Sequence, residues 1–167
     1  MRAAVALFLI PTLTVSSAFA QAATDCAAPA PIPADLAGWQ AEGGAVAAGE
    51  AHSAPWVTIG EVHVITLRSG DGLRWRLPPE RAPRAGSFGG VLALDVREAG
   101  TYRIALADGV WIDLVGPNGL VASTGHGHGP ACSGIRKMVE FRLEPGAYAV
   151  QLSGAASNRT RMLVSPR

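Results

Sequence analysis

The residues of this chain with the widest chemical capacity lie in one glycine-rich segment, residues 123–134. It contains two of the four histidines, His126 and His128, and one of the two cysteines, Cys132. Two imidazoles spaced two residues apart in extended chain project to the same side, as they do when such a pair binds a metal ion. The glycines between and beside them let the backbone fold closely around an ion. The segment is therefore predicted either to bind a metal or to be anchored by a disulfide.

A metal site at His126 and His128 needs at least one further ligand. The thiolate of Cys132 would complete a soft site suited to copper or zinc. His63 or His52 would instead supply a third imidazole, suited to zinc, copper or iron, if the fold brings it near. The alternative is a surface loop whose imidazoles are solvated or bind the backbone, and in that case no cofactor is expected.

The N-terminus predicts export. A basic residue and a short apolar run precede small residues at Ala18 and Ala20, which is the pattern of a signal peptide over residues 1–20. The apolar run is too short to span a bilayer, so we expect a periplasmic or secreted protein without membrane insertion after cleavage. Two cysteines usually pair in an oxidising compartment. A Cys26–Cys132 disulfide is therefore predicted, and it would deny the Cys132 thiolate to a metal.

Two other groups of residues have the right types for a site. Ser123, His126 and Asp113 are the types of a hydrolytic triad, but no nucleophile-elbow sequence surrounds Ser123. No catalytic residue is therefore assigned. His63 lies on the same side of its expected strand as Ile65, which favours a partly buried, hydrogen-bonded imidazole over a metal ligand.

A ligand surface is also predicted from Trp111, Asp113, Arg136 and Lys137. On an alternating strand Trp111 and Asp113 face away from their apolar neighbours. A tryptophan beside a carboxylate can stack on a sugar ring, or it can pack under the N-terminal segment. Arg136 and Lys137 can attract an anion, or they can serve solubility alone.

The charge and composition of the sequence limit the classes of partner that are expected. The formal net charge is +1, and the sequence has neither a basic helix nor a stripe of aromatic and basic residues, so a nucleic-acid partner is not expected. An unidentified protein or small molecule is the expected partner. Trp39, Trp56 and Trp75 are predicted to be packing anchors.

The fold class predicted from hydrophobic patterning is all-β. Residues 21–55 are rich in proline, alanine and glycine, and prolines at alternate positions favour an extended N-terminal arm. From residue 56 onward, short runs of alternating apolar and polar residues indicate an antiparallel, jelly-roll-like two-sheet β-sandwich over residues 56–167. The expected strands span 58–67, 72–77, 88–97, 101–107, 110–115, 119–124, 136–143, 147–153 and 160–165.

A local repeat predicts two equivalent corners of this sandwich. Residues 98–106 read EAGTYRIAL and residues 144–152 read EPGAYAVQL. Both tyrosines of the chain, Tyr102 and Tyr148, fall at the same place in this motif, two residues after a turn glycine. We expect each ring to fill the core while its hydroxyl bonds the backbone near the turn.

Residues 88–165 resemble a known family in four short segments, which are residues 99–102 (AGTY), 111–115 (WIDLV), 119–123 (GLVAS) and 143–148 (LEPGAY). The family is the bacterial pre-peptidase C-terminal domain. Its members are small jelly-roll-like β-sandwiches appended to secreted hydrolases. The resemblance implies an accessory or binding role rather than catalysis.

The segment 125–138, which contains His126-Gly127-His128, is also similar to a group of short exported bacterial proteins often labelled homogentisate 1,2-dioxygenase. That enzyme is a longer cupin-type protein whose non-haem iron is bound by His and Glu. Here the next glutamate after the histidine pair is Glu140. An iron-dependent dioxygenase is therefore the third hypothesis, after a binding module and a metal-binding protein.

Overall fold

The structure is a computed structural model that describes Cys26 and residues 31–167. The predicted signal peptide, residues 1–20, lies outside the described residues. So do residues 21–25 and 27–30 of the segment expected to form an arm.

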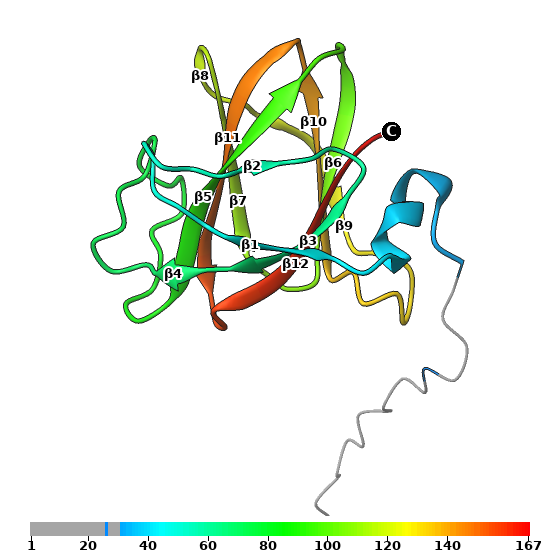
Figure 1. Ribbon diagram of the computed structural model, residues 1–167, viewed down its shortest axis with the longest axis horizontal. Helices are drawn as coiled ribbons and strands as arrows, with labels where there is room; N and C mark the ends of the chain where they lie inside the picture. Colours follow the sequence, from blue (N-terminus) through cyan, green and yellow to red (C-terminus); the bar gives the residue numbers. More distant parts are fainter. Residues whose placement is uncertain (1–25, 27–30) are drawn as a thin grey trace, which may run out of the picture.

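Two mixed sheets pack face to face and form an all-β sandwich, as the patterning predicts (Figure 1). The first sheet has the spatial order β1 (Gly44–Ala47), β3 (Val62–Thr66), β12 (Arg159–Pro166), β6 (Gly100–Leu106), β10 (Lys137–Leu143) and β9 (Ser123–Gly127). The second has the order β2 (Trp56–Val57), β5 (Phe88–Val96), β11 (Gly146–Ala155), β7 (Trp111–Gly116) and β8 (Gly119–Leu120), with β4 (Arg68–Ser69) paired to β5.

The expectation of a purely antiparallel sandwich is wrong at one edge of each sheet. β1 lies parallel to β3, with Gly44 opposite His63, and β2 lies parallel to β5, with Trp56 opposite Ala93. Parallel neighbours need a crossover connection. The chain supplies it by alternating between the sheets, because β2 in the second sheet separates β1 from β3 in the first.

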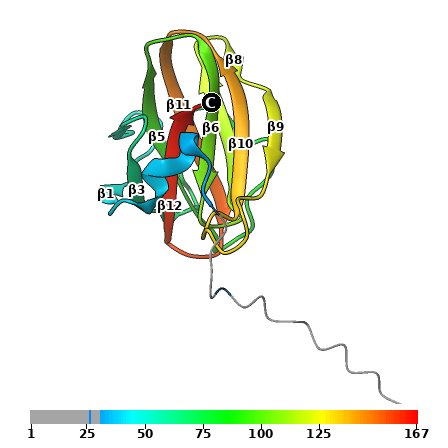
Figure 2. The same ribbon diagram turned by 90° about the vertical axis from the view of Figure 1, so that its right-hand side faces the viewer.

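Part of the segment expected to be an extended arm is regular structure that packs on the sandwich. The 3-10 helix η1 (Ala34–Gln40) lies over β12 and β6 on the outer face of the first sheet (Figure 2). Leu36 and Trp39 are 0% and 4% exposed, which confirms Trp39 as a packing anchor. Such a short helix buries too few side chains to leave a helical period in the sequence. Within the described residues, no helix has the length and apolar character needed to cross a membrane.

The expected strand at 72–77 is instead part of a long loop that covers the outer face of the second sheet. Its backbone bonds a side chain rather than a strand. The Gln151 Oε1 accepts from the N–H groups of Arg76 at 2.6 Å and Leu77 at 3.1 Å, and its Nε2 donates to the Leu77 carbonyl at 3.0 Å. The half-buried Trp75 lies against Gly89 of β5. The alternation of apolar and polar residues in this segment therefore reflects its packing on a sheet and not hydrogen bonding to a neighbouring strand.

Two other expected strands differ from the prediction, one because it is shorter and one because it is divided. The segment 58–67 contains β3 only from Val62, with β2 ending before it at Val57. The segment 119–124 is split between β8 and β9, which belong to different sheets.

The two tyrosine corners predicted from the repeat are confirmed. The Tyr102 hydroxyl donates to the Glu98 carbonyl at 2.9 Å, and the Tyr148 hydroxyl donates to the Glu144 carbonyl at 2.8 Å. Both rings are buried in the main core between the sheets. Each corner thus fixes the turn that precedes its strand to the packed interior.

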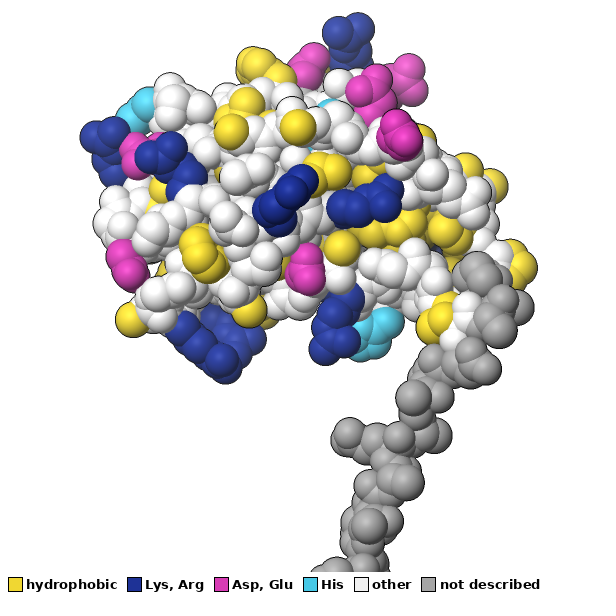
Figure 3. Space-filling model, turned by 60° about the horizontal axis from the view of Figure 1, so that its bottom comes forward, with side chains coloured by type: hydrophobic (Ala, Val, Ile, Leu, Met, Phe, Trp, Pro, Cys, Tyr) yellow, Lys and Arg dark blue, Asp and Glu magenta, His cyan; other side chains and the backbone are white. Residues whose placement is uncertain are grey.

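The basic side chains of the surface differ in whether they form ion pairs. Figure 3 shows Lys and Arg spread over one face of the molecule among hydrophobic side chains. In the basic segment 68–84, Arg74 pairs with Glu50 at 2.7 Å and Arg68 approaches the same carboxylate at 4.0 Å. Arg81 and Arg84 form no ion pair with any described residue.

Candidate functional site

A cleft of about 410 Å³ opens where β7 of the second sheet faces β9 and β10 of the first. It exists because β8 pairs with β7 only at Val115 and Gly116, and the Val121 N–H extends this pairing only to the Leu114 carbonyl. Among the described residues, residues 111–113 therefore have a strand partner on the β11 side alone. Side chains of the main core are therefore reached from outside. The apolar lining consists of Ile112, Val121, Val139 and Phe141. We call this cavity the Trp111 cleft, after the aromatic residue at its wall.

The residues singled out from the sequence meet in this cleft. Its polar and aromatic lining includes Trp111, Asp113, Ser123, His126, His128, Arg136 and Lys137. They come from three elements and the loop after β9, so their proximity depends on the packing of both sheets. Sequence reasoning missed Glu80, which reaches the cleft from the loop over the second sheet.

Asp113 is buried in the wall of the cleft and is 2% exposed. Its Oδ1 accepts from the Trp111 Nε1 at 2.7 Å, and its Oδ2 accepts from the Glu80 N–H at 3.3 Å. Burial raises the pKa of the Asp113 carboxyl above its usual range, and these two hydrogen bonds oppose the shift. A carboxyl perturbed in this way inside a cleft is a marker of a functional site.

Lys137 lies beside Trp111 at the same wall. Its Nζ donates to the Val110 carbonyl at 2.9 Å and lies 4.9 Å from the centroid of the Trp111 ring. Burial lowers the pKa of Lys137, the nearby Arg81 guanidinium lowers it further, and Asp113 opposes the shift. The Arg81 Cζ lies 5.9 Å from the same ring centroid. Trp111 therefore packs with two cations.

The two predicted histidines line the cleft from β9 and the residue after it. His126 lies opposite Val139 in the ladder and is exposed. His128 has its Nδ1 2.6 Å from the Arg136 carbonyl oxygen. A carbonyl only accepts, so the Nδ1 of His128 carries the proton and a neutral ring leaves its Nε2 free to accept or to bind a metal.

The thiol predicted as a third ligand is not available. Cys132 forms a disulfide with Cys26, with the Cα atoms 5.4 Å apart, which confirms the predicted pairing. His63 is buried away from the cleft, and its Nε2 accepts from the Thr58 N–H at 3.1 Å, as expected for a hydrogen-bonded core histidine. Among residues 31–167 and Cys26, no group of three or more His, Cys, Asp or Glu side chains is placed to hold a metal ion.

The triad types also line the cleft, but they are not assembled as a triad. Ser123 and His126 are exposed on β9, whereas Asp113 is buried on β7. The carboxylate oxygens of Asp113 accept from Trp111 and from the Glu80 backbone, and no hydrogen bond joins Asp113 to His126. The arrangement lacks the nucleophile–base–orienter chain that acyl transfer requires.

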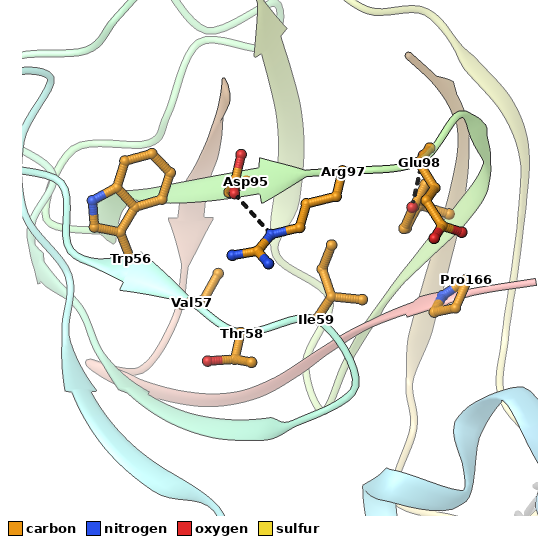
Figure 4. A pocket seen from close by; sticks show the side chains of 9 residues that line it. Trp56, Val57, Thr58, Ile59, Asp95, Arg97, Glu98 and Pro166 are labelled. Atoms are coloured by element: carbon orange, nitrogen blue, oxygen red, sulfur yellow. Dashed lines mark hydrogen bonds and ion pairs between the residues drawn. The ribbon is translucent and has the colours of Figure 1, made fainter. Parts of the chain in front are cut away.

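A second groove, of about 690 Å³, lies at β2 and the end of β5 (Figure 4). Trp56 stands at one side of it and is 62% exposed, so the expectation that it is a packing anchor is wrong. Asp95 and Arg97, at the end of β5, pair with each other at 3.4 Å on one wall of the same groove. Their side chains are 54% and 90% exposed, and solvent screens such a pair strongly. The Trp111 cleft is the better enclosed of the two.

No family model matches this chain, and no curated protein matches it either.

Proposed function

We propose that this chain is an exported binding module that holds a small organic ligand in the Trp111 cleft. The observation that carries the proposal is the opening between β7 and β9, where an apolar floor of core side chains is reached from a rim of polar and charged groups. Small-molecule sites combine these two features, and a volume of about 410 Å³ lies within their usual range.

The lining supports a ligand with an apolar body and a polar end. Val121, Val139 and Phe141 offer apolar contact, and burying such surface is worth about 25 cal/mol per Å². Trp111 adds a large flat surface whose orientation is fixed by its bond to Asp113. The side chains of Lys137 and His128 are in position to receive polar groups.

We propose that the protein binds its ligand in the periplasm or after secretion. The segment 1–20 has the pattern of a signal peptide, and a disulfide persists in an oxidising environment. A binding module outside the cytoplasm also agrees with the accessory role that the resemblance to the pre-peptidase C-terminal domain implies.

The test uses the neutral fluorescent probe phenylnaphthylamine. We expect saturable one-to-one binding to the wild-type protein and a loss of about tenfold or more in the Val121→Trp variant, because the indole fills the apolar contact area of the cleft. Ile59→Trp is the matched control, since Ile59 is also partly buried but lines the Trp56 groove.

Circular dichroism establishes first that both variants are folded. Saturable binding that Val121→Trp leaves intact, or that Ile59→Trp abolishes equally, would contradict the proposal. Absence of saturable binding to the wild-type protein would do so too.

Metal binding by His126 and His128 is a second candidate, supported by the free Nε2 of His128 and by the position of both imidazoles in one cleft. It is tested by elemental analysis for copper, zinc and iron after incubation and desalting. Stoichiometric metal that His126→Ala and His128→Ala each remove would support it. A metal-free protein under the same conditions would eliminate it.

A further inference from the structure

A smaller cavity of about 280 Å³ adjoins the Trp111 cleft and shares Gly109, Trp111 and Lys137 with it. Its other lining residues are 81–84, Ser153 and Gly154. We call it the basic pocket, because Arg81, Arg84 and Lys137 line it and none of the described carboxylates does.

The three cations of the basic pocket have no ion-pair partner within the described part of the chain, although the Asp113 carboxylate is near enough to oppose the lowering of the Lys137 pKa. None of them forms an ion pair there, whereas Arg68 and Arg74 of the same basic segment share Glu50. Burial is the main cause that lowers the pKa of Lys137, and repulsion by the Arg81 guanidinium lowers it further. An anion bound among these cations would relieve their mutual repulsion.

A neutral donor completes the pocket. Ser153 is 1% exposed, and its hydroxyl has no hydrogen-bond partner among the described residues. Buried polar groups are seldom left without a partner. Ser153 lines the cavity beside three cations, and a serine hydroxyl has the chemistry to donate to an oxyanion.

Two glycines leave part of the pocket wall without side chains. The register of β11 against β5 shifts between Leu152 and Ala155, which places Ser153 and Gly154 in a bulge. Gly154 has a φ of +71°, a conformation that favours glycine, and a side chain is absent from Gly109 as well. Bulges are common beside functional sites because they re-aim a side chain.

Trp111 joins the two cavities. Its indole nitrogen is occupied by Asp113, and the cations of Lys137 and Arg81 lie 4.9 Å and 5.9 Å from its ring centroid. A cation above an aromatic ring is held there by the ring's quadrupole. The ring therefore lines both cavities and holds both cations near their shared border.

We propose that the ligand of this protein is an organic oxyanion, whose carboxylate, sulfonate, sulfate or phosphate group lies among Arg81, Arg84, Lys137 and the Ser153 hydroxyl. Its apolar body occupies the Trp111 cleft. The placement of the apolar body rests on the proposed function of the Trp111 cleft. The placement of the anionic group rests on the basic pocket alone.

The first experiment compares two probes that differ in charge. Phenylnaphthylamine is neutral, and anilinonaphthalenesulfonate has the same ring system with a sulfonate. We expect the wild-type protein to bind the sulfonate about tenfold or more tightly, which is the factor for one charge-assisted hydrogen bond. Arg84→Gln should remove this preference and leave the affinity for the neutral probe unchanged, because Arg84 lines only the basic pocket.

The control is Arg97→Gln, which removes a cation from the Trp56 groove and should leave both affinities unchanged. Equal affinities of the wild-type protein for the two probes would overturn the anion inference while sparing the cleft. Loss of the preference in Arg97→Gln as well would overturn it in favour of a nonspecific charge effect.

The second experiment tests the anion pocket without any apolar body. Inorganic phosphate and inorganic sulfate are each titrated at constant ionic strength, and the backbone amide signals are followed by NMR. Saturable shifts at Ser153 and Gly154 that Arg84→Gln abolishes are the expected result. Shifts that do not saturate, or that persist in the variant, would overturn the inference even if the cleft binds the neutral probe.

Discussion

The indole Nε1 of Trp111 donates a hydrogen bond to Asp113 Oδ1 at 2.7 Å, between two residues on the same face of β7. This bond does two things at once. It satisfies one oxygen of a carboxylate that is 2% exposed, and it fixes the plane of the aromatic ring that forms the wall of the cleft. The shape of the candidate site thus depends on a pair of residues that also supports the strand.

Trp111→Phe removes the donor and leaves Asp113 Oδ1 without this partner. We expect a loss of about 1–3 kcal/mol in the free energy of unfolding, the cost of an unsatisfied buried acceptor. The pKa of Asp113 should rise further, since the lost bond opposed the effect of burial. Urea denaturation at neutral pH measures the loss, and an unchanged unfolding free energy would contradict the role given to this bond.

Lys137 predicts the alkaline limit of anion binding. Its pKa is lowered, so it loses its charge at a pH below the usual lysine value of about 10.4. As the pH rises through this lowered pKa, the basic pocket loses a cation and the affinity for anilinonaphthalenesulfonate falls. Lys137→Arg keeps the charge at every accessible pH and should remove this fall. A wild-type profile that remains flat up to the usual lysine range would contradict the prediction.

Glu140 predicts an acid-sensitive contribution to stability on the outer face of the first sheet. It accepts from Arg103 Nη2 and from Arg167 Nη1, both at 2.8 Å, while Arg103 also pairs with Asp35 of η1. The Arg103 hydrogen bond, above all, lowers the pKa of Glu140. A pKa lowered by folding means that this stabilisation is complete above the unfolded-state value of about 4.3 and is lost as the pH falls through the folded-state value.

Glu140→Gln should therefore reduce the free energy of unfolding by about 1.5–3 kcal/mol at neutral pH, the range for hydrogen bonds to charged groups. The difference from the wild-type protein should shrink below the unfolded-state pKa. Glu144→Gln is the control, since Glu144 is exposed and only its backbone bonds Tyr148. A deficit for Glu140→Gln that is independent of pH would show that geometry, not charge, accounts for it.

The disulfide predicts a large effect on stability. Cys26 and Cys132 are 106 residues apart in the sequence, and a cross-link of this span is worth at most about 4–5 kcal/mol by the chain-entropy model. The double variant Cys26→Ala/Cys132→Ala should lose up to this amount in chemical denaturation. Thiol titration of the denatured, unreduced wild-type protein should find no free thiol; two titratable thiols would refute the pairing.

Local signals in the sequence predict the strands that pair with antiparallel neighbours. The repeat that contains Tyr102 and Tyr148 predicts both corners, because a turn glycine and a tyrosine two residues later determine the geometry within a few residues. By contrast, the parallel placement of β1 and β2 depends on a crossover between sheets, which no local pattern encodes. Apolar and polar residues alternate in the loop at 72–77 because the loop packs on a sheet as a strand does. Its backbone N–H groups bond the side chain of the distant Gln151 instead of a neighbouring strand.

The candidate site divides in the same way. The chemistry of His126, His128, Trp111 and Lys137 is evident from residue type and spacing, and the structure brings these side chains to one cleft. The basic pocket is not evident, because it needs the bulge at Ser153 opposite the loop that contains Arg81 and Arg84. No local pattern in the sequence indicates that the bulge and this loop lie opposite each other.

The passage of the chain from β1 to β2 to β3 has a consequence for how the protein folds. The strands β1 and β3 join the first sheet and β2 joins the second, so the chain passes between the sheets twice and neither sheet can be completed before the other has begun to assemble. Pairings of this kind close long loops before any contact rewards them, which slows folding. We therefore expect this chain to stay unfolded for longer than a chain of equal length whose strands pair mainly with their neighbours in the sequence.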